Sequence, residues 1–136
     1  MKVLVDTNIL LDVLLSRADF FCDSRLIFEF VEQKRITGCI SASAITDIFY
    51  IVKKEIKNTE AIYSVIEKLT AIFSVAPVSE TTIANSLALR WKDFEDAVQF
   101  MVAKENGAAY IITRNKADYE SSDIPCMSPA EFVTFL

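Results

Sequence analysis

Short β-branched segments alternate with longer helical segments along all 136 residues, and this alternation limits the fold more than any other feature. Strands are expected at residues 2–5, 38–42, 72–76, 109–112 and 124–127. Strands that alternate with helices form parallel sheets, because each crossover helix returns the chain to the same edge. The sequence therefore predicts an α/β three-layer sandwich, in which a central parallel sheet of four or five strands has helices on both faces.

Helices are expected in the segments between the strands, where apolar residues recur at helical spacing. The predicted positions are residues 9–16, 59–71 and 81–90, with further helices capped by Ser24, by Ser41 or Ser43, by Asp93 and by Ser128. Gly107 is expected to end the helix that begins at Asp93. No internal repeat and no linker rich in Pro, Gly or Ser divides the chain, so residues 1–136 are predicted to form a single domain.

The composition is that of a globular protein. Hydrophobic residues make up 52% of the chain, against 24% charged residues, 2 Gly and 3 Pro, which excludes disordered and collagen-like classes. The longest apolar run, residues 9–15, is interrupted by Asp12 and is shorter than the roughly 18 residues that a membrane span needs. The N-terminus lacks the pattern of a secretory signal peptide. We therefore expect a soluble, cytoplasmic protein with no membrane partner.

Several kinds of active site are excluded by residues that the chain lacks. It contains no histidine, the usual general base near neutral pH, so Ser-His-Asp triads, Cys-His pairs and His-bearing zinc sites cannot form. Cys22, Cys39 and Cys126 are far apart and are expected to be reduced thiols rather than disulfides or metal ligands. With Gly38 and Gly107 as the only glycines, P-loop and G-x-G-x-x-G motifs are also excluded.

Carboxylates are the remaining candidates for chemistry, with 19 Asp and Glu against 14 Lys and Arg and a net charge of −5. Asp6 directly follows the first predicted strand, and Asp118 lies one turn beyond the strand at residues 109–112. Asp47 and Asp96 fall in the first turns of two predicted helices. Because ligands bind beyond the carboxyl ends of parallel strands, these four side chains are expected to converge at one edge of the sheet.

Each acidic residue also has a structural interpretation. Asp6, Asp93 and Asp118 can cap helices or turns, worth about 1 kcal/mol each, and this interpretation is favoured for Asp93 because Asp96 follows three residues later. Asp47 and Asp96 can complement helix dipoles, worth about 0.3–1 kcal/mol. Their joint convergence favours a bound cation instead, because neighbouring carboxylates otherwise repel one another. Oxygen ligands without His or clustered Cys favour Mg²⁺ or Mn²⁺.

Basic residues near these element ends are candidate phosphate contacts, and an ordinary solvated surface is an equally favoured interpretation. They are Lys53, Lys54, Lys57, Arg90, Lys92, Arg114 and Lys116. The aromatic residues are expected in the core or in interfaces, with no role in binding nucleic acid. They include Phe20, Phe21, Phe49, Tyr50 and Trp91.

Four segments carry a family pattern: residues 3–12 (VLVDTNILLD), 43–48 (SAITDI), 93–97 (DFEDA) and 112–119 (ITRNKADY). In this order and spacing they resemble the PIN-domain ribonucleases, a family that includes the VapC-type toxins of bacterial toxin–antitoxin pairs. The resemblance covers nearly the whole chain and implies a PIN-like fold. It also implies a metal-dependent endoribonuclease, a hydrolase that cleaves RNA phosphodiester bonds with one or two Mg²⁺ or Mn²⁺ ions.

The resemblance assigns roles to particular residues. Catalytic and metal-binding roles fall on Asp6, Asp47, Asp96 and Asp118. Supporting roles fall on Asn8, Asp93, Thr113 and Asn115, with Asn115 an alternative to Asp118 as the fourth ligand, and RNA phosphate contacts fall on Arg114 and Lys116. The chain departs from the family pattern at two of these positions, because members usually carry Glu at the position of Asp47 and many carry Asp at the position of Asn115.

The function implied by the resemblance is that of the toxin of a toxin–antitoxin pair, with RNA as substrate, a small antitoxin protein as partner and a homodimer as the assembly. The alternative is a catalytically weak or inactive PIN-like module that binds RNA or a protein. A phosphatase or phosphoacceptor is less favoured, because Asp6-Thr7-Asn8 lacks the second Asp, two residues on, that haloacid-dehalogenase phosphatases use.

Overall fold

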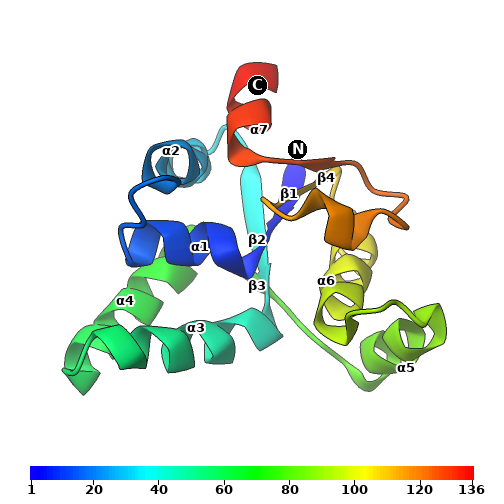
Figure 1. Cartoon of the computed structure of the whole chain (residues 1–136), viewed down its shortest axis with the longest axis horizontal. Helices are drawn as coiled ribbons and strands as arrows, with labels where there is room; N and C mark the ends of the chain where they lie inside the picture. The colour runs from blue at the N-terminus through cyan, green and yellow to red at the C-terminus, as the bar shows by residue number, and fades with distance from the viewer.

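The computed structural model describes residues 1–136 and contains one five-stranded sheet in the order β3-β2-β1-β4-β5. The strands are β1 (Lys2–Val5), β2 (Thr37–Ser41), β3 (Ser74–Ala76), β4 (Tyr110–Ile112) and β5 (Cys126–Met127). Every pairing is parallel, which confirms the predicted α/β architecture (Figure 1). The third strand begins later than predicted, because Ile72 still belongs to the helix before it.

Helices occupy the segments between the strands. They are α1 (Thr7–Leu14), α2 (Phe21–Glu32), α3 (Ala42–Glu55), α4 (Thr59–Ile72), α5 (Glu80–Leu89), α6 (Phe94–Glu105), α7 (Pro129–Phe135) and the short 3₁₀ helix η1 (Lys116–Tyr119). Ser41, Asp93 and Ser128 cap α3, α6 and α7 through their side chains, as predicted. None of these helices has the length and apolar character needed to cross a bilayer.

One detail of the predicted helices, the cap at Ser24, differs in the structure, and another, the role of Gly107, is confirmed. Ser24 does not cap α2, which begins at Phe21. Ser24 is instead fully buried inside the helix, where its hydroxyl donates a hydrogen bond to Asp12. Gly107 follows the end of α6 with a φ of +66°, the left-handed conformation that glycine adopts without strain.

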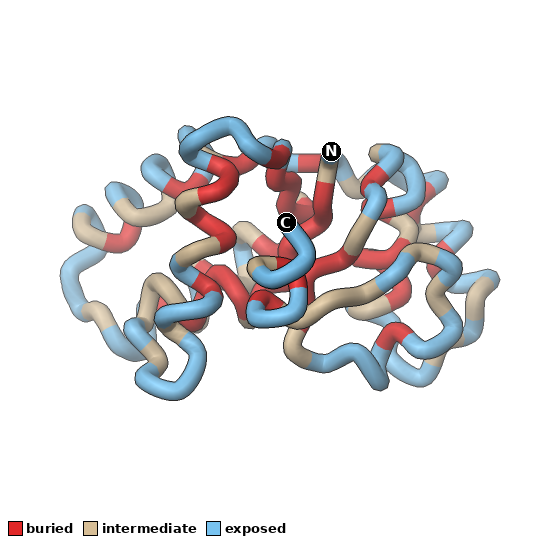
Figure 2. The backbone as a smooth tube through the Cα atoms, turned by 90° about the horizontal axis from the view of Figure 1, so that it is seen from above, coloured by how far each residue is buried: buried red, intermediate tan, exposed pale blue.

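The sheet separates two apolar layers. Val3 and Val5 point to the face covered by α1, α2, α3, α4 and α7, while Leu4 points to the face covered by α6 and η1. This alternation follows from the two-residue period of a strand. Buried residues accordingly run through the middle of the molecule, beneath exposed helix faces and turns (Figure 2).

The position of the functional site follows from the strand order. β1 and β4 pair directly, although about a hundred residues separate them, and the order of strands reverses at this pair. The backbone N–H of Asp6, the first residue after β1, donates to the carbonyl of Ile112 at the end of β4 at 3.0 Å. Asp6 and Thr113 therefore leave the sheet side by side at its carboxyl edge.

Candidate active site

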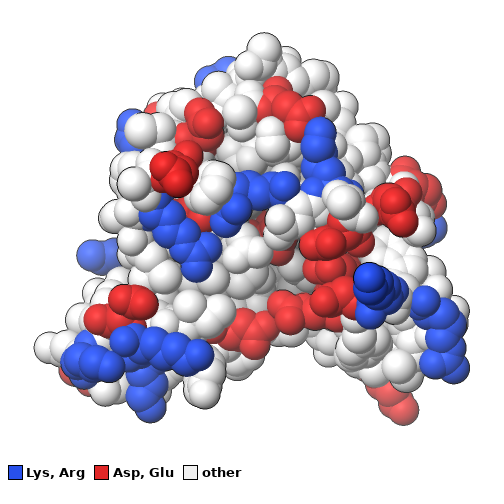
Figure 3. Space-filling model, viewed as in Figure 1, with Lys and Arg blue, Asp and Glu red and all other residues white.

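A cleft with a volume of about 520 Å³ lies at this edge of the sheet. Its walls come from the starts of α1 and α6, from α3 and from the segment after β4. Six carboxylates line it: Asp6, Asp47, Asp93, Glu95, Asp96 and Asp118. Figure 3 shows acidic side chains gathered across the middle of this face. The structure thus brings together the four carboxylates predicted from the sequence, along with Asn8, Asp93 and Asn115.

Asp6 is buried, and both of its carboxylate oxygens accept hydrogen bonds. Thr113 Oγ1 donates to Oδ2 at 2.8 Å, and Gln99 Nε2 donates to Oδ1 at 2.8 Å. The Thr113 hydroxyl in turn accepts the backbone N–H of Asn115 at 3.0 Å. Side chains from β4 and α6 therefore fix the orientation of the carboxylate that follows β1.

Gln99 is a residue of the cleft that the sequence pattern did not single out. Its amide nitrogen also lies 3.4 Å from the hydroxyl of Tyr119, while its oxygen Oε1 is buried with no hydrogen-bond partner. The available signal was its position three residues after Asp96, which places both side chains on one helix face among apolar neighbours.

The first turn of α6 concentrates negative charge. Asp93 Oδ1 accepts the backbone N–H of Asp96 at 3.0 Å, so the capping interpretation of Asp93 is confirmed. Burial, together with the charges of Asp93, Asp118, Asp6 and Glu95, raises the pKa of Asp96 to about 7.

Glu95 is a second residue of the cleft that sequence reasoning missed. Burial raises the pKa of its carboxyl, and the neighbouring carboxylates of Asp47, Asp93 and Asp6 raise it further. Asp47 reaches this region from the half-buried face of α3, and Asp118 from the exposed helix η1. The carboxylates that repel one another across the cleft therefore come from several elements and not only from the first turn of α6.

The donor set fits a hard divalent cation. All the charged ligand candidates are carboxylates, and two buried side-chain oxygens in the cleft lining, Thr7 Oγ1 and Gln99 Oε1, have no hydrogen-bond partner. No group of three or more Asp, Glu, His or Cys side chains is clustered tightly enough in this structure to hold an ion. The residue chemistry thus suits Mg²⁺ or Mn²⁺, while the carboxylates stand apart.

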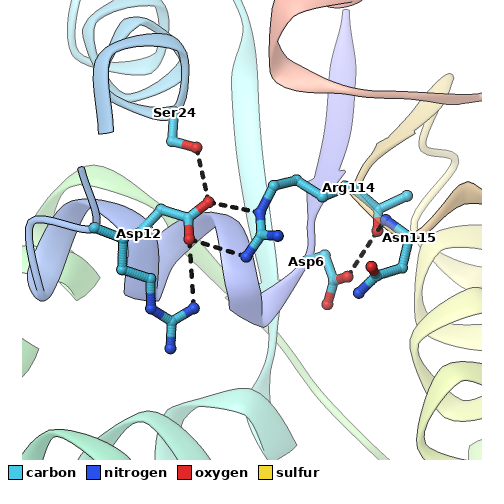
Figure 4. A network of polar contacts seen from close by, with 7 residues as sticks. Asp6, Asp12, Ser24, Arg114 and Asn115 are labelled. Atoms are coloured by element: carbon cyan, nitrogen blue, oxygen red, sulfur yellow. Dashed lines mark hydrogen bonds and ion pairs between the residues drawn. The ribbon is translucent and has the colours of Figure 1, made fainter. Parts of the chain in front are cut away.

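Arg114, predicted as a phosphate contact, has a partly exposed side chain that pairs with a carboxylate of the chain itself. Its Nε and Nη2 donate to Oδ2 and Oδ1 of Asp12 at 2.9 and 3.0 Å (Figure 4). Its guanidinium also stacks on Phe20, 3.8 Å from the ring centroid. Asp12 is fully buried and also accepts hydrogen bonds from Ser24 at 3.1 Å and Arg17 at 3.4 Å. In the sequence, Asp12 interrupts an apolar run and ends the first of the four family segments, with no site role assigned to it.

Lys116, the other predicted phosphate contact after β4, forms a salt bridge with Glu131 at 2.8 Å. The hydrogen bond from Lys116, together with those from Ser128, lowers the pKa of Glu131 to about 2. Both cations that follow β4 therefore have carboxylate partners within the chain.

Comparison with known proteins gives the family. A family model described as "PIN domain" matches residues 2–117. The chain belongs to the PIN-domain family. This PIN domain is 26% identical to "Ribonuclease VapC1" of Aquifex aeolicus (strain VF5), over 96% of this chain and 92% of that protein.

Solved structures share the fold of this PIN domain. VapBC of Salmonella typhimurium, bound to DNA, has a TM-score of 0.74 at 17% identity, and the match covers 95% of this chain and 98% of that one. VapBC2 of Rickettsia felis, bound to a DNA fragment from its promoter, has a TM-score of 0.73 at 18% identity, covering 94% of this chain and 98% of that one. These similarities confirm the PIN-like fold predicted from the sequence.

Proposed function

We propose that this PIN domain is a metal-dependent endoribonuclease and the toxin of a toxin–antitoxin pair. The observation that carries the proposal is the cleft at the β1–β4 edge, which six carboxylates line and where the pKa of Asp96 is raised to about 7. Such a group is stabilised by a divalent cation, and PIN-domain membership makes RNA the expected substrate. The ribonuclease name of the Aquifex aeolicus relative supports the same assignment.

In this proposal Asp6, Asp96 and Asp118 hold one or two Mg²⁺ or Mn²⁺ ions, with Asp47 and Asn115 as further ligands or supports. Bound there, the metal would supply positive charge for the phosphate and a water of lowered pKa. Thr113 and Gln99 orient the carboxylate of Asp6 through their hydrogen bonds. Asp93 fixes the start of α6, and thereby the position of Asp96. Asn8, in the cleft lining, would support the site with hydrogen bonds.

The partners belong to the same proposal. A small antitoxin protein would bind the chain and cover the acidic cleft, and the active assembly would be a homodimer. The toxin–antitoxin complexes among the structures of the same fold support the first of these. Light scattering on the purified chain measures directly whether it forms a homodimer.

The alternative is a PIN domain that binds RNA or a protein without cleaving it. The specific observation in its favour is the separation of the carboxylates, none of which form a group of three able to hold an ion. The shorter Asp47 side chain, where relatives usually carry Glu, points the same way.

The test is cleavage of a panel of single-stranded and structured RNAs with Mg²⁺, with Mn²⁺ and with EDTA. The wild-type chain is expected to cut in either metal and not in EDTA, and Asp96→Asn and Asp6→Asn are expected to abolish cutting. Asp19→Asn, an exposed residue outside the cleft, is the matched control and keeps activity. Cutting that survives EDTA or Asp96→Asn contradicts the proposal, while a folded wild type that binds RNA without cutting it supports the binding module.

A further inference from the structure

The aromatic ring of Tyr50 lies at the wall of the acidic cleft, outside the hydrophobic core. The residue is 65% exposed, and Asp47, Tyr50, Ile51 and Lys54 form the face of α3 that lines the cleft. Phe49, the preceding residue, instead packs against Tyr63 of α4, with ring centroids 5.1 Å apart. Phe49 thus packs against a neighbouring helix, whereas the ring of Tyr50 lies outside the core.

Lys54 is the one cation among the residues that line this cleft. Its ammonium lies 5.0 Å from the ring centroid of Tyr50. The salt bridges of the structure occupy other basic residues: Arg17, Arg25, Lys104, Arg114 and Lys116. Lys54 thus holds a positive charge beside an exposed ring, with no carboxylate partner of its own.

The spacing along α3 connects this pair to the carboxylates. Tyr50 and Lys54 follow Asp47 by three and seven residues, which corresponds to advances of about 4.5 and about 10 Å along the helix on the same face. Stacked nucleotides advance by about 3.4 Å along one strand. If a strand whose scissile phosphate lies at the carboxylates runs along α3, Tyr50 and Lys54 are about one and about three nucleotides beyond that phosphate.

We propose that Tyr50 and Lys54 form a nucleotide subsite beside the ribonuclease centre, in which Tyr50 stacks on a base and Lys54 binds an adjoining phosphate. The inference rests on the function proposed above. Stacking on a protein ring requires a base that is free of a duplex, so the ligand class is single-stranded RNA. Figure 3 supports this path, because basic side chains gather over the far end of α3, next to the central carboxylates.

The experiment measures binding of a labelled single-stranded RNA by fluorescence anisotropy, with Ca²⁺ in place of Mg²⁺ and with intact RNA verified on a gel. Tyr50→Ala is expected to weaken binding between fivefold and about 100-fold, the range for loss of one base–aromatic stack, whereas Tyr50→Phe stays within about twofold. Lys54→Ala is expected to reduce the slope of log K against log salt by about 0.7, because one phosphate contact is lost.

Two control variants match these changes. Lys53→Ala removes a lysine from the same turn of α3 that does not line the cleft, and it is expected to leave the salt slope unchanged. Tyr63→Phe keeps the packing of the exposed tyrosine on α4 and is expected to leave RNA affinity unchanged. Duplex RNA of the same sequence is expected to bind wild type and Tyr50→Ala equally.

The outcomes separate this subsite from the proposed nuclease activity. Binding of single-stranded RNA by Tyr50→Ala within twofold of wild type overturns the subsite, even if the wild type cleaves RNA. A Tyr50→Ala chain whose mass by light scattering changes, with RNA affinity retained, assigns Tyr50 to a protein interface and also overturns it. If wild type binds RNA through Tyr50 and Lys54 but cuts nothing in Mg²⁺ or Mn²⁺, the subsite stands and the nuclease function fails.

Discussion

Arg114 and Asp12 form a bidentate ion pair between residues 102 positions apart, with Nε–Oδ2 and Nη2–Oδ1 distances of 2.9 and 3.0 Å. The pair joins the fully buried carboxylate of α1 to the segment between β4 and η1. That segment also carries Thr113, which orients Asp6, and Asn115, which lines the cleft. The ion pair therefore anchors the segment after β4 to α1, the helix that follows the neighbouring strand β1.

Arg114→Ala is expected to lower the free energy of unfolding by about 3–5 kcal/mol, because it removes two of the hydrogen bonds to a buried carboxylate. Urea unfolding followed by the fluorescence of Trp91, the only tryptophan, measures the change. Arg25→Ala is the matched control, since Arg25 pairs with Glu29 on the helix surface and its loss should cost less than about 1 kcal/mol. Equal losses for the two variants would contradict the structural role of Arg114.

Gln99→Leu is expected to lower the free energy of unfolding by about 1–3 kcal/mol, because the buried Asp6 carboxylate loses one of its two side-chain donors. If the metal proposal holds, Mn²⁺ affinity measured by calorimetry should also fall by about 10-fold to 100-fold, the usual effect of removing a group that orients a ligand. Gln33→Leu, an exposed glutamine after α2, serves as control. Unchanged Mn²⁺ affinity in Gln99→Leu would remove Gln99 from the site.

The stability of the metal-free chain is expected to fall as pH rises from about 4 to about 7. The pKa of Asp96 is about 7 in the folded chain, against an ordinary value of 3.8 for an unfolded chain, so the folded chain binds more protons in this window. Deprotonation at higher pH therefore favours unfolding, and the loss of stability levels off above about pH 8, where Asp96 is ionised in both the folded and the unfolded chain. Melting temperatures recorded in EDTA across this pH range measure the fall in stability. Asp96→Asn should be more stable than wild type at pH 8 and should flatten the profile, and a wild-type profile that rises towards pH 8 would refute the assignment.

Metal binding is expected to release about half a proton at pH 7, because Asp96 is about half protonated there before the ion binds. Calorimetric titration with Mn²⁺ in buffers of different ionisation enthalpy gives this number. At pH 8.5 the release should approach zero, and Asp96→Asn should show none at either pH. Release that persists at pH 8.5 would assign the proton to a different group.

The parts of the site that were predictable are those fixed by local rules. Asp6 was identified because it directly follows a strand, and Asp96 because it falls in the first turn of a helix that Asp93 caps. Gln99 and Asp12 escaped detection because their partners lie 93 and 102 residues away in the chain. No local pattern encodes such a pairing, so only the assembled sheet reveals it.

The fold was predictable to a similar degree and for similar reasons. Hydrophobic periodicity located all five strands, and the largest displacements are the starts of β3 and β5, each two residues later than predicted. The start of β3 is displaced because α4 extends through Ile72. The start of α2 was wrong, because Ser24 has the chemistry of a cap but donates its hydroxyl to buried Asp12 instead. Arg114 is a similar case. From the sequence alone, a basic residue beside a predicted site can equally well contact RNA or pair with a buried carboxylate, and in the structure Arg114 pairs with Asp12.

The pairing of β1 with β4 has a consequence for the timing of synthesis. Residues 3–5 register with residues 110–112, so the central strand acquires its second neighbour only after most of the chain has been translated. On the ribosome, Asp6 emerges early but lacks Gln99 and Thr113 until those residues have left the exit tunnel. Until then the carboxylate of Asp6 lacks the two side chains that orient it, so the cleft is completed only after residue 113 has left the exit tunnel.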